Sequence, residues 1–153
     1  MATPQLANST KTNLYEQDFY LWIETTAQQL KTGNFTEVDL ENLIEEIESM
    51  GRSEKRALES NLVVLLMHLL KYKYQPDKRS KSWLSSIFEH RRRIKKQFKD
   101  SPSLKKYFVE TFAECYQDAR QQASIETGLD LDIFPGESPF DPDECLNQDF
   151  LPE

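Results

Sequence analysis

Residues 53–74, SEKRALESNLVVLLMHLLKYKY, decide the fold. Between Leu62 and Leu70 this segment is apolar almost all round when its residues are placed at 100° intervals on a helix. A helix of that kind is normally central and is contacted on every side. The apolar run is also about half as long as a membrane span requires. The segment therefore predicts the core helix of an all-α protein, with no membrane-spanning helix.

Capping residues and glycines divide the rest of the chain into further helices. Asn13 with Glu16 predicts a helix start, and Gly33 predicts its end. Thr36 with Asp39 starts the next helix, and Met50-Gly51 ends it before Ser53 opens the central one. Ser101-Pro102 is typical of a cap followed by a proline in the first turn. The five main helices expected are 14–31, 36–50, 53–74, 82–100 and 102–127.

The two ends of the chain differ in composition. Residues 1–12 are polar and predict a disordered leader, whereas residues 129–153 contain four of the seven prolines and cannot form a long helix. Within the tail, Asp141-Pro142 predicts a short helical turn. The tail is too apolar to be free, so we expect it to pack across the helices through Leu129, Ile133, Phe134, Phe140, Phe150 and Leu151. The prediction is one helical domain over 13–153, a compact bundle with a Pro-rich tail packed across it.

Several polar side chains fall beside apolar helix faces. On helix 36–50 the apolar face is Leu40, Leu43, Ile44, Ile47 and Met50. An unpaired buried polar group costs about 1–3 kcal/mol, so inward polar residues should have partners. We expect Glu46, His68 and Arg91 to lie close together in a mainly structural cluster, with Glu46 or Asp39 pairing with the arginine. The full set of inward polar residues expected is Asp39, Asn42, Glu46, Asn61, His68, Tyr72 and Arg91.

Catalytic and metal chemistry have weak support in the sequence. Glu46 and His68, with Asp39, could supply mixed oxygen and nitrogen ligands from two helices. The chain has only two histidines and lacks a His-x-x-x-His or Glu-x-x-His repeat, so we expect neither a metal nor a cofactor. His68 with Glu46 could act as an acid–base pair, but no nucleophile, oxyanion hole or Gly-rich loop accompanies them. The sequence therefore favours a protein without enzymatic activity.

Charge is distributed unevenly along the chain. The net charge is −7, yet residues 71–99 contain 11 basic and 2 acidic residues between two acidic blocks. Helical phase places an exposed basic surface at Arg92, Lys95, Lys96 and Lys99. Such a helix could contact nucleic-acid phosphates, or it could be a solvated face balanced by the acidic blocks. The negative net charge opposes binding of a polyanion at long range, so nucleic acid is the alternative and not the favoured partner.

The chain resembles a known bacterial family over residues 15–153. The similar stretches are YEQDFYLWIE, DLENLIEEIESMGRSEKRALESNL, HLLKYKYQPDKRSKSW, DSPSL and the ending NQDFLPE. They resemble the domain-of-unknown-function family numbered twenty-nine, frequent in cyanobacteria. Ser138-Pro139-Phe140 departs from the Cys-Pro-Tyr expected there. The resemblance implies an all-α cytosolic bacterial protein and no established activity, cofactor or catalytic residues.

The remaining features favour a small helical protein-interaction module. The start of the chain lacks a signal-peptide pattern, and two cysteines are typical of reduced thiols in the cytoplasm. Adjacent acidic and basic surfaces could dock a partner protein, including a second copy of the chain. Nucleic-acid association through helix 82–100 is the alternative, and a metal-dependent enzyme using Glu46 and His68 comes after it.

Overall fold

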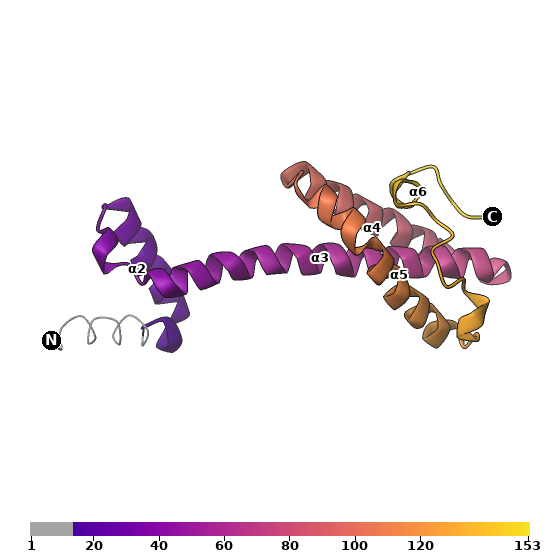
Figure 1. Cartoon of the computed structure of the whole chain (residues 1–153), viewed down its shortest axis with the longest axis horizontal. Coiled ribbons are helices and arrows are strands. Elements are labelled where there is room, and N and C mark those ends of the chain that lie inside the picture. The colour runs from indigo at the N-terminus through magenta and orange to yellow at the C-terminus, as the bar shows by residue number, and fades with distance from the viewer. Residues whose placement is uncertain (1–13) are drawn as a thin grey trace. The chain divides into compact units, whose positions relative to one another are not determined.

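A computed structural model describes residues 14–153 (Figure 1), so the expected leader over 1–12 and the cap at Asn13 lie outside the described residues. The described chain forms helices and turns with no β-strand, which confirms the all-α prediction. It divides into two compact units, one that ends at Ser53 and one that runs from Glu54 to Glu153. We call them the N-terminal and C-terminal units. A single folding domain over 13–153 stays a prediction.

The N-terminal unit begins with a helical turn at 14–17 and continues with α2, Phe19–Lys31. The predicted helix 14–31 is therefore interrupted. The break occurs at Asp18, whose carboxylate accepts a hydrogen bond from the Leu21 backbone N–H at 3.0 Å and caps α2. Gly33 follows α2 with φ +75°, a left-handed conformation that favours glycine, as predicted for the end of the helix. A 3₁₀ turn, η1 (Phe35–Glu37), leads to the next helix.

Helix α3, Leu40–Tyr74, is one continuous helix of 35 residues (Figure 1). The prediction of two helices separated at Gly51 is wrong. A glycine inside a helix costs only about 1 kcal/mol relative to alanine, whereas a break would create two ends with unsatisfied backbone groups. Good helix formers on both sides carry the helix through this position. Ser53, read as a cap, is an interior residue.

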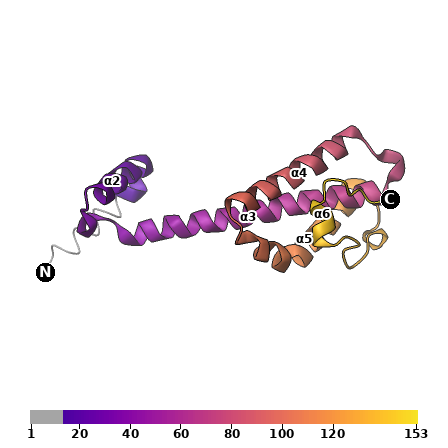
Figure 2. The ribbon, with the colours of Figure 1, turned by 90° about the horizontal axis from the view of Figure 1, so that it is seen from above.

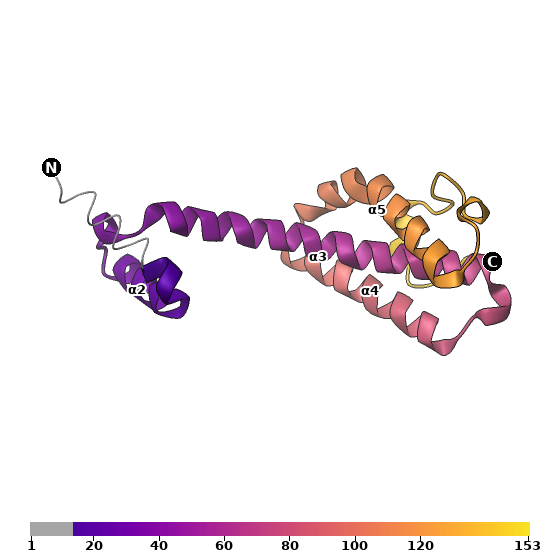
Figure 3. The same cartoon turned by 90° about the horizontal axis from the view of Figure 1, so that it is seen from below.

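In the C-terminal unit, α4 (Lys81–Asp100) and α5 (Leu104–Thr127) lie on opposite sides of α3 (Figures 2 and 3). Ser80 caps α4 by accepting from the Trp83 backbone N–H, and Gly128 ends α5 at φ +72°. The predicted start of the last helix is wrong. Residues 102–103 form a turn, and Ser101 instead donates its backbone N–H to Gln97 at the end of α4.

The core of the C-terminal unit forms around α3. Six leucines of this helix are fully buried: Leu58, Leu62, Leu65, Leu66, Leu69 and Leu70. Buried side chains of α5, among them Phe108, Phe112 and Cys115, belong to the same core. No helix in residues 14–153 is long and apolar enough to cross a bilayer.

The tail packs on this core, as predicted. Phe134, Phe140 and Cys145 are buried within it, and Leu129 and Phe150 are half-buried. Ile133 and Leu151 are exposed, so the prediction that they are buried is wrong: the irregular tail has no fixed period that would turn every apolar residue inward. The short helix α6, Pro142–Leu146, begins with a capping box in which Glu144 accepts from the Asp141 backbone N–H at 3.1 Å.

Candidate functional site

Arg91 joins α4 to the tail. Its side chain is only 5% exposed, its Nε donates to the Cys145 carbonyl at 2.6 Å, and its Nη2 donates to the Phe150 carbonyl at 2.7 Å. The predicted pairing of Arg91 with a carboxylate is therefore wrong. Burial lowers the pKa of Arg91, because desolvation disfavours the charged guanidinium. Within residues 14–153 no acidic side chain forms an ion pair with this cation.

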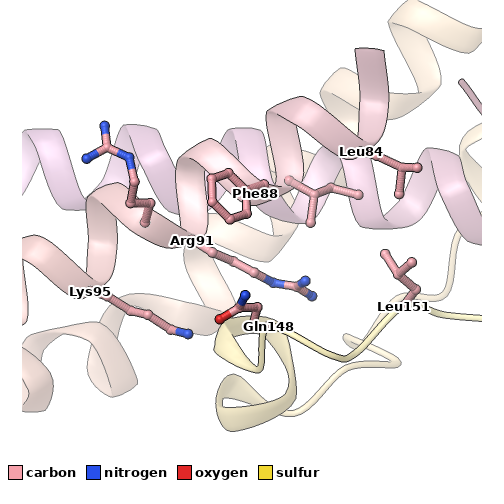
Figure 4. A pocket seen from close by; sticks show the side chains of 8 residues that line it. Leu84, Phe88, Arg91, Lys95, Gln148 and Leu151 are labelled. Carbon is pink, nitrogen blue, oxygen red and sulfur yellow. The ribbon is translucent and has the colours of Figure 1, made fainter. Parts of the chain in front are cut away.

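A groove of about 330 Å³ opens between α4 and the tail, beside Arg91 (Figure 4). We call it the α4–tail groove. Its walls combine apolar side chains with three cations and one amide. The lining residues are Leu84, Ile87, Phe88, Arg91, Arg92, Lys95, Gln148 and Leu151. In Figure 4, Arg91 reaches from α4 toward the tail, and Lys95 and Gln148 lie at one end of the groove while Leu84 and Leu151 lie at the other.

The cations around the groove differ in how they are balanced. Glu89 accepts from Arg92 at 2.7 Å and from Arg93 at 3.0 Å, and these bonds lower the pKa of Glu89 to about 2. Lys95 forms no ion pair in the part of the chain that the structure describes. The groove thus has an apolar end and a positively charged end. Arg91, which two hydrogen bonds to the tail hold in place, lies between α4 and the tail beside it.

The basic surface expected from the sequence follows the same helix. Arg92, Lys95, Lys96 and Lys99 are all exposed on α4. Only Arg92 and Lys95 line the groove, whereas Lys96 and Lys99 lie outside its lining. The helical phase could not separate these two pairs, because the opposite wall of the groove comes from the tail.

Glu46, Asp39 and Asn42 have their partners within the N-terminal unit. Glu46 accepts a hydrogen bond from the Tyr15 hydroxyl, which raises the pKa of Tyr15. Asp39 is buried and accepts from the Asn42 side chain at 2.7 Å and from its backbone N–H at 3.3 Å, so it caps α3. Glu46 and Asp39 are thus engaged locally, and the contacts of His68 and Arg91 lie in the C-terminal unit.

His68 meets the second histidine of the chain through Ser86. Its Nδ1 lies 2.8 Å from the Val64 carbonyl, and the Ser86 hydroxyl lies 3.4 Å from that nitrogen and 3.3 Å from Nδ1 of His90. A carbonyl only accepts, so Nδ1 of His68 carries a proton and cannot also take one from Ser86. Nδ1 of His90 lies 2.7 Å from the Ser86 carbonyl and therefore also carries a proton, so neither histidine can take the serine proton through this nitrogen. Burial lowers the pKa of His68.

Ser86 and His90 were missed as partners of His68. They lie four residues apart on α4, a spacing that places them on one helix face. The spacing of Ser86 and His90 is visible in the sequence. The sequence does not show that this face of α4 lies opposite His68 of α3.

Asn61 and Tyr72 complete the predicted polar set, and both are half-buried on α3. The Tyr72 ring lies 4.1 Å from the guanidinium carbon of Arg79, whose Nε donates to the Tyr72 carbonyl at 2.7 Å. Among residues 14–153, no three His, Cys, Asp or Glu side chains are grouped so that they could hold a metal ion. The suggested ligand set of Asp39, Glu46 and His68 is thus contradicted within the described chain.

The comparison with known families agrees with the resemblance drawn from the sequence. The family model described as "Domain of unknown function DUF29" matches residues 14–151. The chain belongs to the DUF29 family. No curated protein and no solved structure matches this DUF29 chain. The function of this DUF29 chain is therefore argued below from its own side chains.

Proposed function

We propose that this chain is a protein-interaction module, and that the α4–tail groove binds an extended acidic segment of a partner protein. The observation that carries the proposal is the cation of Arg91, held at the groove by two tail carbonyls without a carboxylate partner in residues 14–153. A guanidinium has five N–H donors, and these two bonds leave others available. A buried positive charge is stabilised most strongly by an anion with hydrogen-bonding oxygens.

The apolar end of the groove adds a second requirement on the partner. Phe88 and Leu84 are exposed on α4 and face Leu151 of the tail across the groove. Covering them with an apolar side chain gains about 25 cal/mol per Å² of apolar surface removed from water. A segment with an aromatic or aliphatic residue next to an aspartate or glutamate would therefore satisfy both ends at once.

Binding of a labelled acidic peptide that alternates glutamate with phenylalanine tests the proposal by fluorescence anisotropy. We expect Lys95→Glu to weaken binding at least about tenfold, which corresponds to 1.4 kcal/mol. The matched control is Lys96→Glu, because Lys96 carries the same charge on the same helix but does not line the groove. Equal loss in both variants, or equal binding of a peptide without phenylalanine, would count against the groove.

Nucleic-acid binding is the second candidate, and one observation favours it. Lys95, Lys96 and Lys99 are exposed and form no ion pair within residues 14–153. Phosphate contacts would make the affinity for duplex DNA or RNA fall steeply with salt. Here Lys96→Glu and Lys95→Glu should weaken binding equally. Submicromolar affinity at physiological salt with that pattern would favour this function over the first.

A bacterial cytoplasmic setting accompanies the proposal. Cys115 and Cys145 are free and buried, and burial raises the pKa of Cys145 to about 12, so this thiol stays protonated and unreactive. Thiols of this kind suit a reducing compartment. Localisation of a fluorescent fusion, with a periplasmic signal as the contradicting outcome, tests this setting.

A further inference from the structure

The N-terminal unit presents an apolar cleft of about 320 Å³ between α2 and the first turns of α3. Its lining includes Phe19, Ile23 and Leu30 from α2, and Ile47 and Met50 from α3. Each of these five side chains is more than 40% exposed, and Met50 reaches 67%. We call this surface the hairpin face. The apolar face predicted for helix 36–50 is thus real, but little of it is covered.

The hairpin face is too apolar to be an ordinary solvated surface. Contiguous apolar patches on soluble proteins mark docking sites for other molecules. The floor of the cleft is Trp22, which is 3% exposed and whose indole N–H has no hydrogen-bond partner among the described residues. The buried apolar part of residues 14–53 is small, since it consists of Trp22 and Val38. A further helix laid in the cleft would give these residues the core that two helices alone do not provide.

Charge identifies the kind of helix. Residues 14–53 contain nine acidic and two basic side chains, a net charge of −7, and one of the two bases, Arg52, is paired with Glu45 at 2.7 Å. Glu46 lines the cleft itself. A partner with basic residues beside its apolar stripe would approach this field favourably, whereas a partner of like charge would be repelled.

We propose that the hairpin face docks an amphipathic helix of a partner protein whose apolar stripe is flanked by lysine or arginine. Two copies joined through this same face are disfavoured, because they would bring together two 14–53 segments that each carry a net charge of −7. Residues 1–13 of the same chain are disfavoured by their chemistry, since they contain one basic residue, Lys11, and only Met1 and Leu6 as large apolar residues. The proposal is independent of the α4–tail groove, which lies in the other unit.

Isothermal titration calorimetry of the full chain with two synthetic helices tests the proposal. Both probes carry leucine at i, i+3, i+4 and i+7, and their other positions are lysine in one and glutamate in the other. We expect the lysine probe to bind, and to bind at least about tenfold more tightly than the glutamate probe at ~0.15 M salt. Equal affinity for the two probes, or no binding of either, would overturn the proposal.

Variants locate the binding on the surface. Ile47→Asp should weaken the lysine probe at least about tenfold. Ile125→Asp is the matched control, because Ile125 is a 79% exposed isoleucine on α5 that lies outside the cleft, and it should leave the affinity unchanged within about twofold. Equal loss in both variants would contradict docking at this face. A chain that sediments as a dimer and becomes monomeric on Ile47→Asp would identify a second copy as the occupant and overturn the proposal.

If Ile47→Asp loses helicity, a charge-reversed variant tests the same surface without changing its apolar side chains. Glu24→Lys with Glu48→Lys changes two exposed side chains without touching the apolar floor. The affinity of the lysine probe should fall several-fold, and that of the glutamate probe should rise. Unchanged affinities of both probes would show that charge does not select the partner.

Discussion

Arg91 shows how a single buried cation can fix an irregular tail. Its two bonds, to the carbonyls of Cys145 and Phe150, satisfy acceptors that the tail cannot pair within a regular helix. A hydrogen bond to a charged group contributes about 1.5–3 kcal/mol, and a buried carbonyl left without a donor costs a similar amount. Arg91 therefore lines the groove and also holds the tail, which forms the opposite wall.

Arg91→Met is expected to destabilise the protein by about 2–4 kcal/mol, because both carbonyls lose their donor while the apolar volume is kept. Urea unfolding followed by circular dichroism measures the loss. Limited proteolysis should also cut residues 129–153 faster in the variant. Glu46→Ala is the informative control: it was expected from the sequence to strand Arg91, but Glu46 bonds to Tyr15, so a loss below about 1 kcal/mol is now expected.

His68 gives the chain a pH-dependent stability. Burial lowers its pKa in the folded state, so the unfolded chain binds more protons once the pH falls below the usual histidine value of about 6.5. Stability contributed by neutral His68 is complete above that pH and is lost as the pH falls toward the folded pKa. Urea unfolding at pH 7.5 and 5.5 should show a smaller pH effect in His68→Gln than in the parent chain. An unchanged difference would show that other groups cause the effect.

At the scale of elements, Gly51 shows that a residue with low helix propensity can lie inside a helix when its neighbours favour the helix. The residue lies inside α3, and a Cβ added to it would meet no atom within 4 Å. Gly51→Ala should therefore stabilise the protein by about 0.5–1 kcal/mol, through a lower entropy cost of helix formation. Thermal unfolding measures the gain.

Gly128 is the matched control for that substitution. It also has open space around it, but its φ of +72° is costly for any residue with a Cβ. Gly128→Ala should destabilise by about 1 kcal/mol. Stabilisation by both substitutions would mean that the end of α5 adjusts freely, and loss in both would contradict the continuous helix.

Features that depend on neighbouring residues could be predicted from the sequence, whereas features that depend on competing signals or on distant parts of the chain could not. Periodicity identified the buried stripe of α3, and a glycine identified the end of α2 at Gly33, because both depend on local chemistry. It could not show that Asp18 interrupts the first helix or that α3 continues through Gly51, since several helix signals compete there. For the site, the prediction that Arg91 faces inward is confirmed, but the prediction that a carboxylate is its partner is wrong. Backbone carbonyls of an irregular tail leave no pattern that a sequence reading can use.

At the scale of the whole molecule, the surfaces of the two units differ in the charge of the partner that each would attract. The N-terminal unit is acidic around an apolar cleft, and the C-terminal unit has cations beside an apolar groove. Two surfaces of opposite sign can engage two different partners, or two parts of one partner. With both proposed docking surfaces occupied, the chain would link other proteins.

The units should also differ in local stability. The buried core cluster lies entirely in residues 58–145, whereas the described part of the N-terminal unit buries few apolar side chains. Since opening free energy follows buried apolar contacts, backbone amides of α2 should exchange with solvent at least about tenfold faster than those of Leu62–Leu70 in α3. Hydrogen–deuterium exchange read by mass spectrometry measures this directly. Addition of the lysine-bearing helix should slow exchange in α2 and leave α5 unchanged, because a ligand stabilises only the state that binds it. Equal protection of α2 and α3 in the free chain would instead indicate one cooperative domain, as the sequence predicted.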